Sequence, residues 1–177
     1  MSMEEACSDD DLVEQIRAGD EKAAEELIKR YYAAILRYCK RQGFPVEKAE
    51  DLTQETFLKL FQNLSGYKEK RNFKAYLYAI ANHLCIDESR KRKVYSLEKE
   101  EETGCECARL RQIEDASEAD CLLNILSKEQ REAVILRFDG ELSFREIAQV
   151  TGCSLRTAQS RVRNALKMMR KEWGNEK

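Results

Sequence analysis

The stretch SFREIAQVTGCSLRTAQSRVRNALKMMRK, residues 143–171, decides the fold of the C-terminal part of this chain. Ser143 and Glu146 have the spacing of a capping box, which starts a helix by satisfying free backbone N–H groups. Gly152 suits the turn after that helix, because glycine adopts a positive φ without a Cβ penalty. Ser154 can cap the helix that follows. The pattern therefore predicts a helix-turn-helix.

The second helix of this motif is apolar on one side and basic on the others. Its apolar face, which we expect to be core, carries Leu155, Ala158, Val162, Leu166 and Met169. No acidic residue occurs from Ser154 to Lys171. A capped short helix followed by a basic amphipathic helix suits the major groove, so the sequence predicts a DNA reader. By spacing, the outer-face candidates are Arg156, Thr157, Gln159, Ser160, Arg163 and Asn164, with Lys167 farther along.

Composition limits the class of protein. The chain has 177 residues, of which 36% are charged, and contains only 7 glycines and 1 proline, which favours an all-helical fold. No apolar run reaches membrane-spanning length and no signal peptide opens the chain, so we expect a soluble, cytoplasmic protein. Neither a phosphate-binding glycine loop nor a nucleophile–histidine–acid set occurs, so we expect no enzyme activity and no cofactor.

Helical periodicity divides the chain into two domains. Four apolar-periodic segments, about residues 9–18, 20–42, 46–64 and 73–93, form a first domain over residues 1–94. Residues 95–117 are acidic and lack a sustained apolar period, which indicates a flexible linker. Residues 118–177 form a second domain, in which Ser127 and Gln130 have the spacing of another capping box. This domain ends in the helix-turn-helix. The predicted fold class is all-α, with two small helical domains that the linker allows to be compact or extended.

Charge is unevenly distributed although the net charge is only -2. Acidic residues concentrate in residues 1–26 and 98–120, and basic residues concentrate in residues 90–93 and in the last helix. One interpretation is that the acidic segments are simply solvated. The other is that they lie against the basic segments and weaken DNA binding until a partner separates them.

The 7 cysteines are an odd number, which argues against a disulfide framework. Cys39 and Cys85 fall on apolar helix faces, where cysteine behaves as a small hydrophobic residue. Cys105 and Cys107 lie in the acidic linker, and with His83 or Cys121 they could bind zinc or sense redox state. Because there is no second well-spaced pair, we predict no metal site.

Four motifs resemble the extracytoplasmic-function sigma factors of bacterial RNA polymerase. These are AEDLTQETFLKLF at 49–61, FKAYLYAIA at 73–81 followed by Asp87, LSKEQREAVILR at 126–137, and LSFREIA at 142–148. The resemblance covers nearly the whole chain apart from the linker and both ends. It implies a sigma region 2 domain at 1–94 that docks on polymerase and recognises and melts the −10 element, and a sigma region 4 domain at 118–177 that recognises the −35 element.

The resemblance assigns the outer face of the third helix to the clamp coiled coil of the largest polymerase subunit. The residues implied are Asp51, Gln54, Glu55, Phe57 and Lys59. The alternative for the same residues is a solvated amphipathic helix. The flap of the second-largest polymerase subunit is the further contact implied for the chain.

The loop before the fourth helix and that helix itself are the expected −10 surface. The candidates are Arg71, Lys74, Tyr76, Tyr78, Asn82, His83, Arg90, Lys91, Arg92 and Lys93. Basic side chains neutralise phosphates, and aromatic rings stack on unstacked bases. Family members often have arginine at the position of Asn82, asparagine at that of His83 and tryptophan at that of Tyr76. The alternative for His83 is a half-buried helix residue with one hydrogen bond.

The function predicted is that of an alternative sigma factor, which binds RNA polymerase core and directs it to selected promoters. The resemblance also implies an anti-sigma factor as a partner. The alternatives are a stand-alone helix-turn-helix regulator, which has no need of the docking helix at 49–61, and a metal or redox sensor built on Cys105, Cys107 and Cys121.

Overall fold

The computed structural model describes residues 7–68, 72–98 and 118–175, and its described part is helical without any strand. In chain order the elements are α1 (Asp9–Arg17), α2 (Glu21–Arg41), α3 (Val46–Gln62), the short 3₁₀ helix η1 (Leu64–Gly66), α4 (Phe73–Glu98), α6 (Glu118–Asn124), α7 (Lys128–Phe138), α8 (Phe144–Thr151) and α9 (Leu155–Asn175). The predicted all-α class is confirmed.

Helices α1 to α4 form an N-terminal unit whose boundaries follow local capping chemistry. Ser8 and Asp11 make a capping box at the start of α1, and the carboxylate of Asp20 accepts from the backbone N–H of Lys22 at the start of α2. Helices α2, α3 and α4 then bury apolar stripes against one another. The core of this unit includes the fully buried Leu27, Ile35, Leu60 and Leu77.

Helices α6 to α9 form a C-terminal unit, and its predicted caps are confirmed. Ser127 with Gln130 and Ser143 with Glu146 both make capping boxes. Gly152 has φ 65° and ψ 28°, the left-handed conformation that the turn requires. The hydroxyl of Ser154 accepts from the backbone N–H of Thr157 at 3.1 Å, which caps α9.

The prediction that Leu155 and Leu166 belong to the core is wrong. Their exposed fractions are 41% and 37%, whereas Ala158, Val162 and Ala165 are buried. The buried stripe of α9 is centred on these three residues at i, i+4 and i+7, and both leucines lie to one side of it. Small alanine side chains allow α9 to pack closely on α7 and α8, and this leaves the leucines at the edge of the contact.

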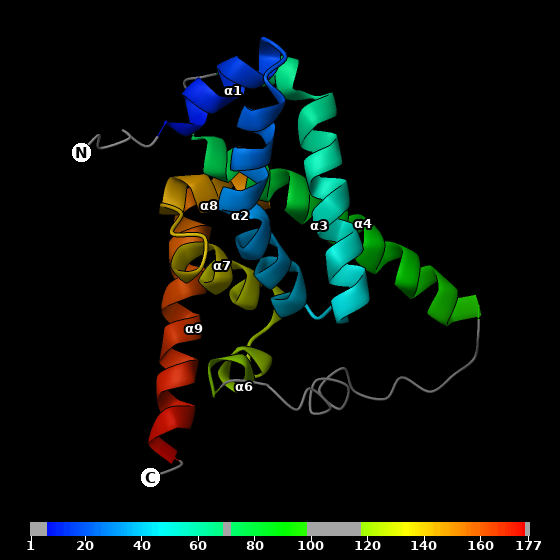
Figure 1. The fold of residues 1–177 in the computed structure, drawn as a ribbon. Helices are drawn as coiled ribbons and strands as arrows, with labels where there is room; N and C mark the ends of the chain where they lie inside the picture. The colour runs from blue at the N-terminus through cyan, green and yellow to red at the C-terminus, as the bar shows by residue number, and fades with distance from the viewer. Residues whose placement is uncertain (1–6, 69–71, 99–117, 176–177) are drawn as a thin grey trace.

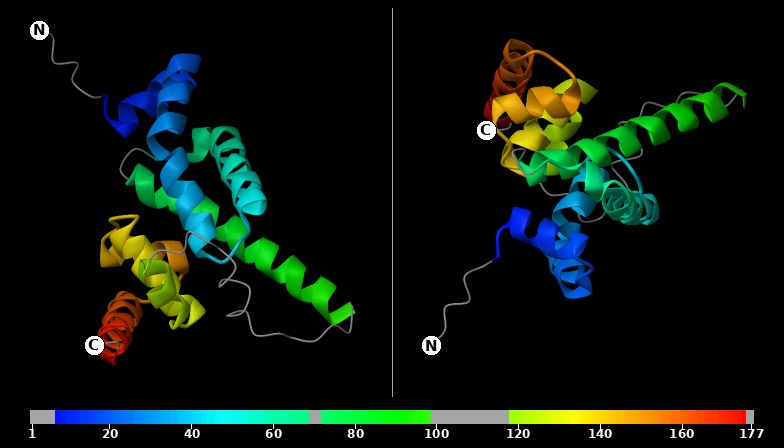
Figure 2. Two further views of the ribbon diagram at one scale, coloured as in Figure 1. Left: turned by 60° about the horizontal axis from the view of Figure 1, so that its bottom comes forward. Right: turned by 90° about the horizontal axis from the view of Figure 1, so that it is seen from above.

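The two units lie against each other. Helix α8 packs on α4, with α7 beside it, near the C-terminal end of α2 (Figure 1). Seen from above, the C-terminal unit covers only the first part of α4, and the rest of that helix projects away (Figure 2). Helix α4 continues to Glu98 and so passes the domain boundary predicted at residue 94. Most of the predicted linker lies outside the described residues.

Candidate nucleic-acid interface

The outer face of α9 is open, as a DNA-reading helix requires. Its first three turns expose most of the predicted contact residues, and Ser160 is half-buried: the exposed ones are Arg156, Thr157, Gln159, Arg163 and Asn164, followed by Lys167. The amide of Asn164 donates to the hydroxyl of Ser160 at 3.4 Å. Because the helix is capped by Ser154 and held by a buried alanine–valine stripe, these side chains project from a fixed backbone.

A hollow runs beside the N-terminal half of this helix. It has a volume of about 330 Å³ and is lined by Gln130, Ser154, Arg156, Thr157, Ser160, Arg161 and Asn164. Every lining residue is polar, and none is acidic. The hollow therefore offers hydrogen-bond donors and positive charge to a nucleic-acid backbone or base edge.

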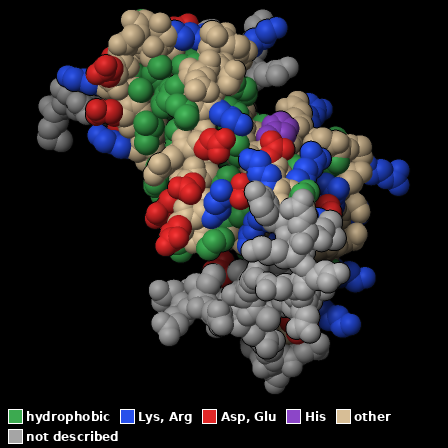
Figure 3. Space-filling view, turned by 90° about the vertical axis from the view of Figure 1, so that its right-hand side faces the viewer, with side chains coloured by type: hydrophobic (Ala, Val, Ile, Leu, Met, Phe, Trp, Pro, Cys, Tyr) green, Lys and Arg blue, Asp and Glu red, His purple; other side chains and the backbone are tan. Residues whose placement is uncertain are grey.

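The −10 candidates in the N-terminal unit are placed very differently from one another. His83 and Arg90 to Lys93 are exposed, and the guanidinium of Arg92 lies 5.9 Å from the ring centroid of Phe44. Lysine and arginine side chains lie on both sides of the histidine, with acidic side chains among them (Figure 3). Tyr76 is half-buried beside Tyr67, with ring centroids 5.1 Å apart. Arg71 lies outside the described residues.

Two of the −10 candidates, Tyr78 and Asn82, are buried in this arrangement. The ring of Tyr78 is fully buried and meets that of Tyr38 edge-on at 5.4 Å. Burial raises the pKa of Tyr78 to about 12, and its hydroxyl has no partner among the described residues. The amide of Asn82 accepts from the Tyr38 hydroxyl at 3.2 Å and donates to the carbonyl of Val150 at 3.1 Å. Neither side chain can contact a base while the units are packed together.

Acidic residues of the C-terminal unit cover part of the same surface. The ammonium of Lys74 lies 2.8 Å from the carboxylate of Glu141, and the amide of Asn72 donates to Glu146. Arg41, at the end of α2, pairs with Asp120 at 3.0 Å and with Asp139. One of the two interpretations of the sequence was acidic masking by residues 1–26 and 98–120. The described contacts include Asp120 from that set, but the other three acids belong to the turn between α7 and α8 and to α8.

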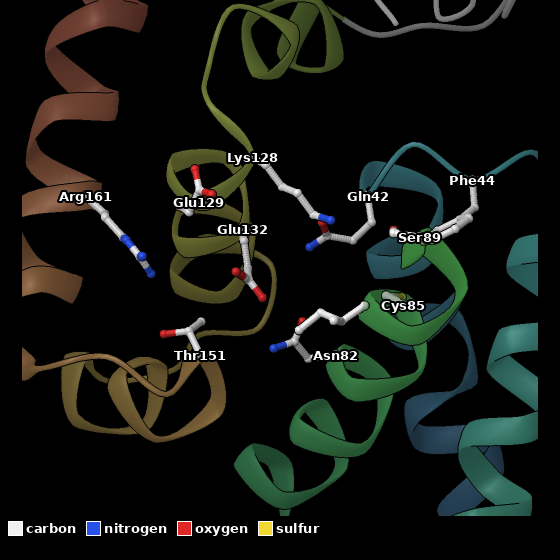
Figure 4. A pocket seen from close by; sticks show the side chains of 11 residues that line it. Gln42, Phe44, Asn82, Cys85, Ser89, Lys128, Glu129, Glu132, Thr151 and Arg161 are labelled. Carbon is white, nitrogen blue, oxygen red and sulfur yellow. The ribbon is translucent and has the colours of Figure 1, made fainter. Parts of the chain in front are cut away.

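A cavity lined by both polar and apolar side chains remains between the two units. It has a volume of about 240 Å³ and is walled by Gln42, Asn82, Cys85 and Ser89 on one side and by Lys128, Glu132, Thr151 and Arg161 on the other (Figure 4). Burial raises the pKa of the Glu132 carboxyl, whereas nearby Arg161 and Lys128 act against that rise. The contact between the units is thus incompletely filled at its centre.

The predicted docking face on α3 is mostly exposed. Asp51, Gln54 and Glu55 are exposed, and the ammonium of half-buried Lys59 lies 3.7 Å from Glu55. Phe57 is only 5% exposed, and its ring stacks on that of Tyr32 with centroids 6.3 Å apart. Phe57 is therefore a core residue that packs beneath this face and is not part of its exposed surface.

Sequence reasoning missed one exposed residue of this face. Leu58 is 57% exposed although it is apolar. It lies seven positions after Asp51, so both project from the same side of the helix. That spacing was the available signal, because it places an apolar residue on the polar side of an amphipathic helix.

The remaining expectations concern metals and membranes. No group of histidine, cysteine, aspartate and glutamate side chains suited to a metal occurs within residues 7–68, 72–98 and 118–175. Cys105 and Cys107 lie outside those residues. Across the same described ranges, no helix combines the length and the apolar character needed to cross a membrane.

Comparisons with known proteins match both units to one kind of protein. The sigma-70 region 2 family model matches residues 27–94, and the sigma-70 region 4 model matches residues 116–169. The ECF RNA polymerase sigma factor SigW of Bacillus subtilis is 28% identical over 175 residues, which cover 90% of this chain and 94% of SigW. The ECF RNA polymerase sigma factor SigD of Mycobacterium tuberculosis is 34% identical over 175 residues, covering 89% of this chain and 82% of SigD.

A solved structure shares the arrangement of helices. The sigma factor RpoE, in complex with the anti-sigma factor NepR from Bartonella quintana, superimposes with a TM-score of 0.70 at 24% identity. The match covers 83% of this chain and 94% of RpoE. At this identity the likeness concerns the fold.

Proposed function

Because the chain belongs to the extracytoplasmic-function sigma factors of RNA polymerase, which direct the core enzyme to promoters, we propose which of its surfaces carry out each step. The exposed face of α9 reads the −35 element, with Gln159, Ser160 and Arg163 nearest the bases. The single observation that carries this assignment is the open, acid-free face of a helix fixed by caps at both sides of its turn. Arginine pairs with guanine and glutamine with adenine in the major groove.

The N-terminal unit melts the −10 element in this proposal. Lys74, Tyr76, His83 and the basic segment 90–93 provide charge and a ring at the surface, while Tyr78 and Asn82 become available only when the two units separate. Melting then draws on binding to unstacked bases, since each stacked base is worth about 1–3 kcal/mol. Separation of the units on the polymerase is therefore a required step.

The outer face of α3 docks on the polymerase clamp. Asp51, Gln54 and Glu55 supply polar contacts, and exposed Leu58 supplies an apolar anchor at their centre. Buried apolar side chains surrounded by polar residues are the usual composition of a tight protein contact. By the family's practice we also propose the polymerase flap as a contact of the C-terminal unit, an anti-sigma factor as a partner, and the cytoplasm as the compartment.

The test is transcription reconstituted from purified core polymerase, this chain and a library of genomic fragments. We expect discrete promoter-specific starts that core enzyme alone does not make. The docking variant Leu58→Glu should lose core binding in a pull-down, while Glu25→Lys, on the exposed side of α2, should keep it. If the unaltered chain neither binds core polymerase nor yields specific transcripts, the proposal fails, however well α9 binds a duplex.

A further inference from the structure

Two cysteines from different helices touch in the core of the N-terminal unit. Cys39 on α2 and Cys85 on α4 have their sulfur atoms 3.9 Å apart. Cys39 is fully buried and Cys85 is 4% exposed. Both are free thiols, and nothing in promoter recognition uses them. Two sulfurs in van der Waals contact on neighbouring helices meet the first geometric condition for a disulfide.

The two cysteines of this pair differ in the acidity of their thiols. The S–H of Cys85 donates to the sulfur of Cys39, and this donation lowers the pKa of the Cys39 thiol although burial opposes it. The hydroxyl of Thr53 on α3 acts in the same direction. Cys39 is thus the more acidic thiol of the pair, and Cys85 is the thiol that holds its proton more tightly.

The cavity between the two units gives this pair a route to solvent. Cys85 forms part of its wall, next to Asn82 and Ser89, and faces Lys128 and Glu132 across it (Figure 4). The cavity holds about 240 Å³ and has polar side chains on both sides, so it admits water and small polar molecules. Cys85 is therefore the sulfur that an entering oxidant meets first.

We propose that Cys39 and Cys85 are a peroxide-reactive dithiol, which closes to a reversible disulfide when hydrogen peroxide or a small organic hydroperoxide enters the cavity. The site rests on the fold of the N-terminal unit and on the cavity, and not on the proposed function.

The reaction balances in two steps. The sulfur of Cys85 attacks one peroxide oxygen and the O–O bond breaks; the departing oxygen takes the thiol proton and leaves as water, and Cys85 becomes a sulfenic acid. The sulfur of Cys39 then attacks that of Cys85; the S–S bond forms, the S–O bond breaks, and the departing hydroxide takes the Cys39 proton as water. Two sulfurs are oxidised by two electrons in total, and one peroxide is reduced to two waters.

Closing the bond affects the contact between the units. A disulfide holds its sulfurs about 2 Å apart, so the two sulfurs must move closer than the present 3.9 Å, and the side chains of Cys39 and Cys85 must shift within the core. Tyr38 is the neighbour of Cys39, and Asn82 lies one turn before Cys85. The hydroxyl of Tyr38 donates to the amide oxygen of Asn82, and the amide nitrogen of Asn82 donates to the carbonyl of Val150 in the C-terminal unit. Oxidation therefore acts directly beneath the point where the units are joined.

The direct test is a full-length variant that keeps only Cys39 and Cys85, with serine at the other cysteine positions. After hydrogen peroxide, we expect alkylation of the unfolded chain to find no free thiol and the intact mass to fall by two hydrogen atoms. Dithiothreitol should restore both thiols. The matched control adds Cys39→Ser, which leaves Cys85 without a partner and should yield sulfenic acid without the mass loss.

Peptide mapping of the unaltered chain keeps the proposal testable if the serine variant does not fold. After peroxide, a peptide containing Cys39 should be joined to one containing Cys85, and reduction should separate them. Both thiols remaining free, oxidation stopping at sulfinic acid, or the sulfurs joining two different chains would each overturn the proposal. Because these readouts need neither DNA nor polymerase, their failure leaves the proposed function standing.

Discussion

The two surfaces proposed to face DNA differ in availability. The C-terminal unit presents the outer face of α9 to solvent, whereas in the N-terminal unit Tyr78 and Asn82 are buried, Asn82 against Val150 of the other unit, and Lys74 is paired with Glu141. The packing there is imperfect, because a cavity lies between the units and the buried hydroxyl of Tyr78 has no partner among the described residues. An unsatisfied buried polar group costs about 1–3 kcal/mol. The contact is therefore built to open, and the difference between the surfaces is one of access.

We expect the largest effect from a substitution in the core that holds α9 in place. Ile147 is fully buried beneath the helix-turn-helix, and Ile147→Ala should destabilise the C-terminal unit by about 2–5 kcal/mol, because the cavity left behind closes only in part. Urea unfolding followed by circular dichroism measures this loss. Leu166→Ala is the matched control: since Leu166 is exposed, we expect a change within about 0.5 kcal/mol. Equal losses of stability in the two variants would show that Leu166 is part of the core.

The second test sharpens the role of the open surface. Arg163→Ala should weaken binding to a −35 duplex by roughly 5- to 150-fold, which corresponds to about 1–3 kcal/mol for one lost bidentate base contact. Affinity for core polymerase should stay the same, as measured by fluorescence anisotropy with labelled core. Arg17→Ala is not a suitable control, because that guanidinium holds backbone carbonyls of Leu64 and Tyr67. Lys29→Ala, at an exposed position of α2, is a suitable control and should change neither the affinity for DNA nor that for polymerase.

The third test opens the covered surface. Arg41→Glu places a carboxylate beside Asp120 and Asp139, where the present side chain makes a half-buried ion pair with both. We expect the packed arrangement to lose about 2 kcal/mol, roughly a 30-fold shift toward separated units. Small-angle scattering should show a larger radius of gyration, and single-stranded −10 DNA should bind more tightly.

Charge-swap rescue checks that the ion pair is responsible. Adding Asp139→Lys to Arg41→Glu should restore part of the compact form. Lys48→Glu is the matched control, because its partner Glu88 belongs to the same unit and is 3.0 Å away. If Lys48→Glu expands the chain as much as Arg41→Glu does, the contact between the units is not what the reversal breaks.

Sequence reasoning recovered what is local. The caps at Ser127, Ser143 and Ser154 and the left-handed Gly152 are consistent with short-range chemistry that a few adjacent residues determine. The outward placement of Arg156 and Arg163 follows from helical period alone. Leu155 was placed in the core wrongly because an apolar face of five residues does not define the exact centre of the buried stripe, which depends on how α7 and α8 pack against it.

What sequence could not predict is how the units meet. Asn82 was expected on DNA, and its amide instead bridges Tyr38 and Val150, residues 44 and 68 positions away. Nothing near Asn82 in the chain indicates such partners. The contacts of Lys74 and Asn72 with acidic residues could not be predicted either. In the sequence, Glu141 and Glu146 have only local roles, in a turn and in a capping box. Long-range pairing of this kind depends on tertiary packing, which no periodicity encodes.

The smallest effect tests whether charge at the centre of the contact between the units changes the stability of the chain. Burial raises the pKa of Glu132, so its contribution to stability is fully present below the ordinary carboxyl pKa and is lost as pH rises through the raised value. The charged groups near it are Arg161, Lys128 and Glu129, on the same side of the cavity. Glu132→Gln should therefore stabilise the chain at neutral pH by roughly 0.5 kcal/mol or less and flatten this part of the pH profile.

Glu129, one turn earlier on α7, supplies a control of opposite sign. Its backbone hydrogen bond at the helix start lowers its carboxyl pKa, so its stabilisation is present above the ordinary carboxyl pKa and is lost as pH falls through the lowered value. Glu129→Gln should weaken the chain slightly at neutral pH. Urea midpoints measured from about pH 4 to about pH 7 separate the two residues. Changes of the same sign would mean that burial between the units does not determine the pKa of Glu132. The ion pairs of Arg41 and Lys74 would then be what holds the two units together.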